Sequence, residues 1–124
     1  MSKSHALLTF IGRSLLAAIF IWSGLQKVLA YGETLAYMQA FGVPSLSLPV
    51  VILVELAGGV AILAGLLTRW AAIVLALFCL ATAVVFHSDF ADATQAVMFM
   101  KNLAIAGGLI LLYANGPGAY AVRS

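Results

Sequence analysis

Long runs of apolar residues, interrupted at few positions by polar ones, are the dominant pattern along the chain. Four such runs cover roughly residues 5–30, 48–67, 69–87 and 95–115. Each run is about 20 residues long or longer, which is enough for a helix to cross a hydrocarbon core of about 30 Å. A segment that spans a membrane has to satisfy its own backbone hydrogen bonds, so helices are expected. The pattern therefore predicts an all-α fold, a four-transmembrane-helix bundle that forms one membrane domain over residues 1–124.

The connection between the first two runs, residues 31–48, is the longest. It contains ETLAYMQAF, in which Leu35, Met38 and Phe41 recur at helical spacing. This spacing predicts a short amphipathic interfacial helix between helices 1 and 2, lying at the membrane surface. An irregular loop is the alternative. The second connection, at about residues 65–69, is expected to be a tight turn.

Composition supports the bilayer as the main solvent of the chain. The sequence is 65% hydrophobic and 8% charged, whereas soluble domains are about half apolar and about a quarter charged. The net charge of +2 is spread thinly, which excludes the clustered basic face that nucleic acid requires. With one cysteine, Cys79, the chain has no disulfide pair, so redox chemistry would need a cofactor, a quinone or a partner. The first run carries Arg13 and lacks a cleavage site, which favours an uncleaved helix over a signal peptide.

Charges at the ends of the runs predict the orientation. Four spans place both termini on one side, with Lys3, Arg69 and Arg123, and the other side carries mainly the acidic residues Glu33, Asp89 and Asp92. Lysine and arginine concentrate on the cytoplasmic side of membrane proteins. Both termini are therefore predicted to be cytoplasmic.

A few ionisable residues fall within the runs and are the candidates for chemistry: Arg13, Lys27, Glu55, His87 and Lys101. A charge at the centre of a span costs about 2.5–3.5 kcal/mol or more, so these side chains should face the protein interior or a wet cavity. Glu55 and Lys101 are both expected about 10 Å below the outer end of their helices. Glu55 then has two available cations, Lys101 and Lys27. Whether the carboxylate forms a structural ion pair or moves protons is left open.

Helical periodicity of 100° per residue predicts which residues share the interior face of each helix. Four stripes result: Arg13, Phe20, Ser23, Gly24 and Lys27; Glu55, Gly58, Gly59, Ile62 and Gly65; Arg69, Ala76, Ala83 and His87; and Lys101, Ile105, Gly108 and Asn115. Small residues in these stripes allow membrane helices to pack closely. A bundle with an internal polar seam is therefore expected.

Simpler roles exist for several of these residues. Arg13 and Lys27 can extend to the lipid head groups, and His87 can be an ordinary interfacial histidine. HSDFAD holds His87, Asp89 and Asp92, but three such ligands in a flexible loop are weak evidence, and no metal site is predicted. His5 and His87 lie at opposite faces, which argues against a haem held by two histidines. Cys79 is interpreted as core packing.

The motifs GRSLLAAIFIWSGLQK, GVP, ELAGG, LLTRWAA, FH and FMKNLAIAGGLILL occur in this order from Gly12 to Leu112. In this the chain resembles the DoxX family of small bacterial inner-membrane proteins. The resemblance implies a four-helix protein of the inner membrane, related to quinone-linked membrane subunits of oxidoreductases and to a complex for oxidative stress. The resemblance marks five positions that match the family's motifs and are expected to be important, without assigning any of them a catalytic role: Lys27, Glu55, His87, Lys101 and Asn102.

Two function classes follow. In the first, the chain is a quinone-interacting subunit of a membrane oxidoreductase system, with a soluble or membrane oxidoreductase as partner. Its candidate catalytic residues are Glu55, His87 and Lys101, and its candidate quinone pocket comprises Ser23, Lys27, Glu55, His87, Lys101 and Asn102. In the second, it is a non-enzymatic scaffold or a carrier of a small lipophilic molecule. Whether the chain is an enzyme, and whether it forms a homo-oligomer in the lipid bilayer, is left open.

Overall fold

The computed structural model describes residues 2–122, and all regular structure within them is helical. The elements are α1 (Lys3–Leu29), α2 (Tyr31–Ala40), α3 (Ser47–Ala64), α4 (Thr68–Phe86) and α5 (Ala93–Asn115). Four of them, α1, α3, α4 and α5, are long and apolar enough to cross a membrane. The predicted all-α class with four spans is confirmed.

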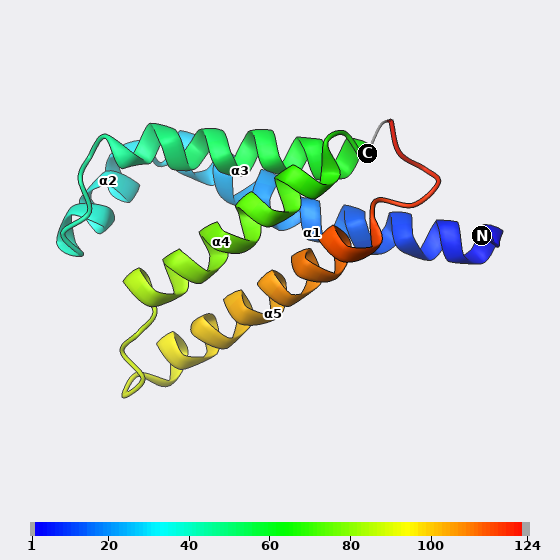
Figure 1. The fold of residues 1–124 in the computed structure, drawn as a ribbon. Coiled ribbons are helices and arrows are strands. Elements are labelled where there is room, and N and C mark those ends of the chain that lie inside the picture. The colour runs from blue at the N-terminus through cyan, green and yellow to red at the C-terminus, as the bar shows by residue number, and fades with distance from the viewer. Residues whose placement is uncertain (1, 123–124) are drawn as a thin grey trace.

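The long helices form two side-by-side pairs, α1 with α3 and α4 with α5 (Figure 1). Helix α4 also packs against α3 and so joins the two pairs. The pairs diverge toward the end of the molecule at which α2 lies, and the start of α1 and the segment that follows α5 lie toward the opposite end (Figure 1). Both termini are therefore on one side of the bundle, as four spans require.

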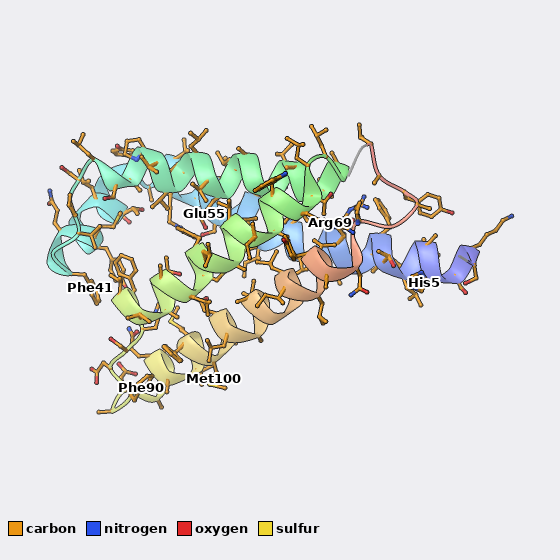
Figure 2. All side chains as sticks on the ribbon, viewed as in Figure 1. His5, Phe41, Glu55, Arg69, Phe90 and Met100 are labelled. Carbon is orange, nitrogen blue, oxygen red and sulfur yellow. The ribbon has the colours of Figure 1, made fainter. Side chains whose placement is uncertain are left out.

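The core lies where the two pairs meet. It is built from small and aliphatic residues of all four spans, among them Ala17, Ile62, Leu75 and Leu109. Many large apolar side chains instead project outward from the bundle (Figure 2). Such a surface would drive aggregation in water, whereas lipid solvates it without cost.

The helix ends differ by a few residues from the predicted bounds. Helix α3 stops at Ala64 rather than at residue 67 because Gly65 has a left-handed φ of 73°. Leu67 is also left-handed, with φ 50°, and the tight turn predicted here is confirmed. Helix α5 begins earlier than predicted because the Asp92 side chain caps it, accepting a hydrogen bond from the backbone N–H of Thr94 at 2.9 Å.

The segment between the first two spans contains the expected short helix. Helix α2 begins directly after Ala30, which alone separates it from α1. Its Met38 side chain is buried. Tyr37 stacks on Phe86 of α4 at a ring-centroid distance of 5.5 Å, and Phe41 meets the same ring edge to face at 5.1 Å. The irregular loop considered as the alternative is thereby excluded.

Candidate functional site

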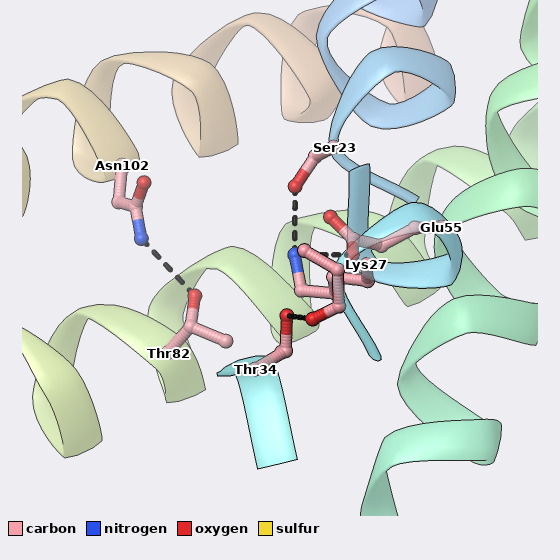
Figure 3. A network of polar contacts seen from close by, with 7 residues as sticks. Ser23, Lys27, Thr34, Glu55, Thr82 and Asn102 are labelled. Carbon is pink, nitrogen blue, oxygen red and sulfur yellow. Dashed lines mark hydrogen bonds and ion pairs between the residues drawn. The ribbon is translucent and has the colours of Figure 1, made fainter. Parts of the chain in front are cut away.

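Glu55 pairs with Lys27 across the interface between α3 and α1. Nζ of Lys27 lies 2.7 Å from Oε1 of Glu55, and it donates a hydrogen bond of 2.7 Å to Oγ of Ser23, one turn earlier on α1 (Figure 3). The approach to Oε1 makes an ion pair but falls outside hydrogen-bond geometry. The two partners differ in exposure, because 25% of the Lys27 side chain is accessible and only 4% of the Glu55 side chain is.

Glycines bring the two helices close enough for this contact. A Cβ on Gly24 would lie 3.3 Å from Cβ of Glu55, and a Cβ on Gly59 would lie 3.2 Å from the backbone nitrogen of Ile21. Larger residues would therefore push α1 away from α3. Small residues at such contacts let membrane helices approach closely, and here they place the carboxylate against the last turn of α1.

A second polar contact lies on the other helix pair. The Asn102 side-chain amide donates to Oγ1 of Thr82 at 3.0 Å and to the backbone carbonyl of Cys79 at 3.2 Å (Figure 3). This bond fixes α5 against α4. Near the open end of the pair, Nδ1 of His87 lies 2.9 Å from Oε1 of Gln95. Since an amide oxygen only accepts, Nδ1 is the donor in this contact.

These groups surround one cavity of about 230 Å³ between the two helix pairs and α2. Of the residues named as a candidate pocket from the sequence, the cavity wall includes Ser23, Lys27, Glu55, His87 and Asn102. The rest of the wall is mainly apolar and aromatic, and Lys27 and Glu55 form the ion pair in it. The cavity thus combines a low-dielectric interior with one ion pair and a few hydrogen-bonding groups.

Lys101 is the one residue of the predicted pocket that does not line this cavity. It is exposed and lines a shallow apolar groove on the outer face of α5, with Ala96, Val97, Met100 and Ala104. The stripe predicted for this helix is wrong at Lys101, although its Ile105 does line the cavity. Asn102, Ala106 and Leu109 also face the interior. A pair between Glu55 and Lys101 is therefore wrong, and the cation that meets Glu55 is Lys27.

The interpretation of Arg13 as a residue that extends to the lipid head groups is also wrong. Arg13 does not reach toward head groups, since it is 2% exposed. Its guanidinium donates to the backbone carbonyls of Pro117 at 2.6 Å, Tyr120 at 2.5 Å and Leu63 at 3.1 Å. It ties the segment after α5 to α1 and α3, at the end opposite the cavity. Arg123, used in predicting the orientation, lies outside the described residues.

Sequence reasoning missed several members of the cavity wall, among them Thr34, Tyr37, Met38, Thr82 and Phe86. The residues from α2 were missed because that helix was expected to lie on the membrane surface. Thr82 carried a signal, since it follows Cys79 by three residues and Phe86 follows it by four, which places all three on one face of α4. Within residues 2–122 no group of three or more His, Cys, Asp or Glu residues could hold a metal ion.

Residues 8–88 match the DoxX family. The chain belongs to the DoxX family. It is 48% identical over 122 residues to the inner membrane protein YqjF of Escherichia coli K12, a match that covers 98% of this chain and 94% of YqjF. It is also 31% identical over 123 residues to the inner membrane protein YphA of the same organism, covering 94% of this chain and 88% of YphA. No solved structure matches significantly. This DoxX protein is therefore an inner-membrane protein with four spans.

Proposed function

We propose that this DoxX protein is the quinone-binding membrane subunit of an oxidoreductase system. The cavity between the helix pairs is the observation that carries the proposal, because it joins apolar walls to polar groups on both sides. Ligand sites generally have this character, with a few placed polar groups in an apolar pocket. A cavity of about 150 Å³ holds benzene, so about 230 Å³ gives room for a substituted six-membered ring.

The ammonium of Lys27 on α1 is the donor that fits a carbonyl oxygen of a quinone ring, since it carries three hydrogens and has two close partners. On the opposite pair, Asn102 and Thr82 line the cavity, but Asn102 already donates to Thr82 and both donate to the carbonyl of Cys79, so a second quinone oxygen would have to replace one of these bonds. Phe86 and Phe78 provide aromatic faces between them. Reduction of a quinone to a quinol takes up two electrons and two protons. Glu55 is the group placed to accept and deliver a proton inside the cavity.

The electrons have to come from a partner. The sequence has a single cysteine and thus no dithiol pair of its own, so we assign electron transfer to a soluble or membrane oxidoreductase. The chain's own contribution is to hold the ring, exclude lipid and supply protons. With Lys3 and Arg69 at the terminal end, we propose that the termini are cytoplasmic and that the α2 end faces the cell exterior.

The test is to purify the protein from native membranes and to measure co-purified quinone by mass spectrometry. Wild type should retain quinone, and Glu55→Gln should lose most of it while it still elutes as a folded protein. Lys101→Met is the matched control, since this lysine lies on the same third of the bundle but faces outward, and it should retain quinone. Absence of quinone from every wild-type preparation would overturn the proposal and favour a scaffold or a carrier of another lipophilic molecule.

A further inference from the structure

A second hollow lies on the other side of Lys27. It is an open groove of about 370 Å³ between the last turn of α1 and α2. Its wall contains the polar residues Ser23, Gln26, Lys27, Glu33, Thr34 and Tyr37, together with Ala30. The groove therefore differs in character from the apolar surface that most of the bundle presents to lipid.

The groove and the internal cavity share a wall. Ser23, Lys27, Thr34 and Tyr37 line both of them. Glu55 lines only the cavity, and Glu33 lines only the groove. The ion pair thus joins a residue of the shared wall to one that lines the cavity alone. The exposure of the two partners is consistent with this, since 25% of the Lys27 side chain is accessible, against 4% of Glu55.

The wall shared by the groove and the cavity is held weakly where it is formed by α2. In the part of the chain that the structure describes, no side-chain hydrogen bond or ion pair joins α2 to α3, α4 or α5. The Thr34 hydroxyl bonds to the carbonyl of Ala30 on its own segment at 2.9 Å. Helix α2 is instead held to α4 by aromatic contacts with Phe86, stacked for Tyr37 and edge to face for Phe41, which follows the helix. Aromatic contacts of this kind are worth about 0.5–1.5 kcal/mol each beyond their buried area, which allows brief local opening.

We propose that the groove between α1 and α2 is the aqueous entrance to the cavity, and that Lys27 is its gate. While Lys27 is paired with Glu55 and bonded to Ser23, its side chain separates the groove from the cavity. When the pair breaks, the flexible lysine stem can swing into the groove, and water reaches Glu55. That this path delivers protons to a bound quinone rests on the proposed function, whereas the entrance itself does not.

Cys79 is a built-in reporter for this entrance. It is the only cysteine in the sequence, it lines the cavity but not the groove, and it is 3% exposed. The experiment places the protein in lipid nanodiscs, where both faces are open to solution. Permanently charged methanethiosulfonate reagents are added, and the mass of the intact protein is followed over time. Such reagents do not enter lipid, so labelling of Cys79 has to occur through an aqueous path.

Wild type should be labelled slowly, and Lys27→Ala should be labelled about tenfold faster or more, the change that about 1.4 kcal/mol in the opening equilibrium produces. A cationic and an anionic reagent of similar size are compared. Opening of a gate accelerates both, whereas attraction by the uncovered Glu55 carboxylate accelerates only the cationic one. Lys101→Ala should label at the wild-type rate, and Cys79→Ser should not label.

A second variant keeps the test independent of the stability of Lys27→Ala. Gln26→Trp adds bulk to the groove from α1, at a residue that does not line the cavity, and should slow labelling by both reagents. The proposal fails if Gln26→Trp leaves the rate unchanged, or if Lys27→Ala accelerates only the cationic reagent. Because no quinone takes part in the labelling, its outcome and the outcome of the quinone extraction are read separately.

Discussion

Loss of Lys27 should be the most damaging change at the ion pair, because it leaves the buried partner alone. In Lys27→Met the Glu55 carboxylate, 4% accessible, loses its cation. No side-chain hydrogen bond to Glu55 exists among the described residues to replace it. Breaking a buried pair by removing one partner typically costs about 3–5 kcal/mol. We expect a loss near that range in the free energy of unfolding.

Loss of Glu55 should cost less. In Glu55→Gln, Lys27 keeps its hydrogen bond to Ser23, and with 25% of its side chain accessible it can reach water or head groups. The exposed share of this lysine lowers the penalty, and we expect about 1–2 kcal/mol. The double variant contains no unpaired buried charge and should be more stable than Lys27→Met. The sum of the single losses then exceeds the double loss by about 2 kcal/mol.

Reversible unfolding in mixed detergent micelles, followed by the fluorescence of Trp22 and Trp70, measures these differences. Lys101→Met is the control, since it removes an exposed lysine from the same third of the bundle and should leave stability unchanged or slightly higher. The reasoning is refuted if Glu55→Gln costs as much as Lys27→Met. It is also refuted if the two losses add to within about 0.5 kcal/mol, the agreement expected of independent sites.

Two further pairs of variants test contacts that hold the helices and the segment after α5 in place. Arg13→Met removes three charge-assisted hydrogen bonds to carbonyls and should cost about 3 kcal/mol or more; limited proteolysis should cut the segment after α5 sooner than in the exposed control Arg69→Met, and equal cutting would contradict this role. Gly59→Ala places a Cβ 3.2 Å from the backbone of Ile21 and should cost about 1–3 kcal/mol. Gly107→Ala meets nothing within 4 Å and should stabilise by about 0.5–1 kcal/mol, so thermal unfolding should shift in opposite directions.

The spans could be predicted because bilayer thickness and backbone hydrogen bonding leave few choices for an apolar run of this length. The turn after α3 was also predictable, since glycine tolerates the left-handed φ found at Gly65. The facing of α1 was correct for the same kind of reason. Its stripe joins Arg13, Gly24 and Lys27, which are buried or half-buried in the structure.

Helix α5 shows where periodicity fails. Lys101 and Asn102 are adjacent and both polar, so stripes drawn through either one differ by 100° and fit the sequence about equally well. The structure selects Asn102 for the interior, where its amide bonds to Thr82. The physical reason is that a lysine can carry its charge along the lipid face toward the surface on a flexible stem, whereas a short amide has no such reach and needs a partner inside.

The interior facing of Arg13 could be predicted from the sequence, but its partners could not, because they are backbone carbonyls. Such carbonyls belong to every residue and leave no mark in the amino-acid pattern. They become acceptors only when the chain end after α5 folds back over α3, where the backbone N–H of Val122 also donates to the carbonyl of Ala64 at 2.9 Å. Long-range geometry of this kind is set by packing rather than by local preference.

The ion pair joins the structural and the functional interpretations of Glu55, which need not exclude each other. A pair buried at both ends would only fix the register of α1 against α3. A pair open at both ends would contribute little to stability. Here the carboxylate is buried in the cavity wall while the lysine also lines the outer groove. A contact with this asymmetry can stabilise the bundle when closed and connect Glu55 to water when open, so a large coupling energy and fast labelling of Lys27→Ala are expected together.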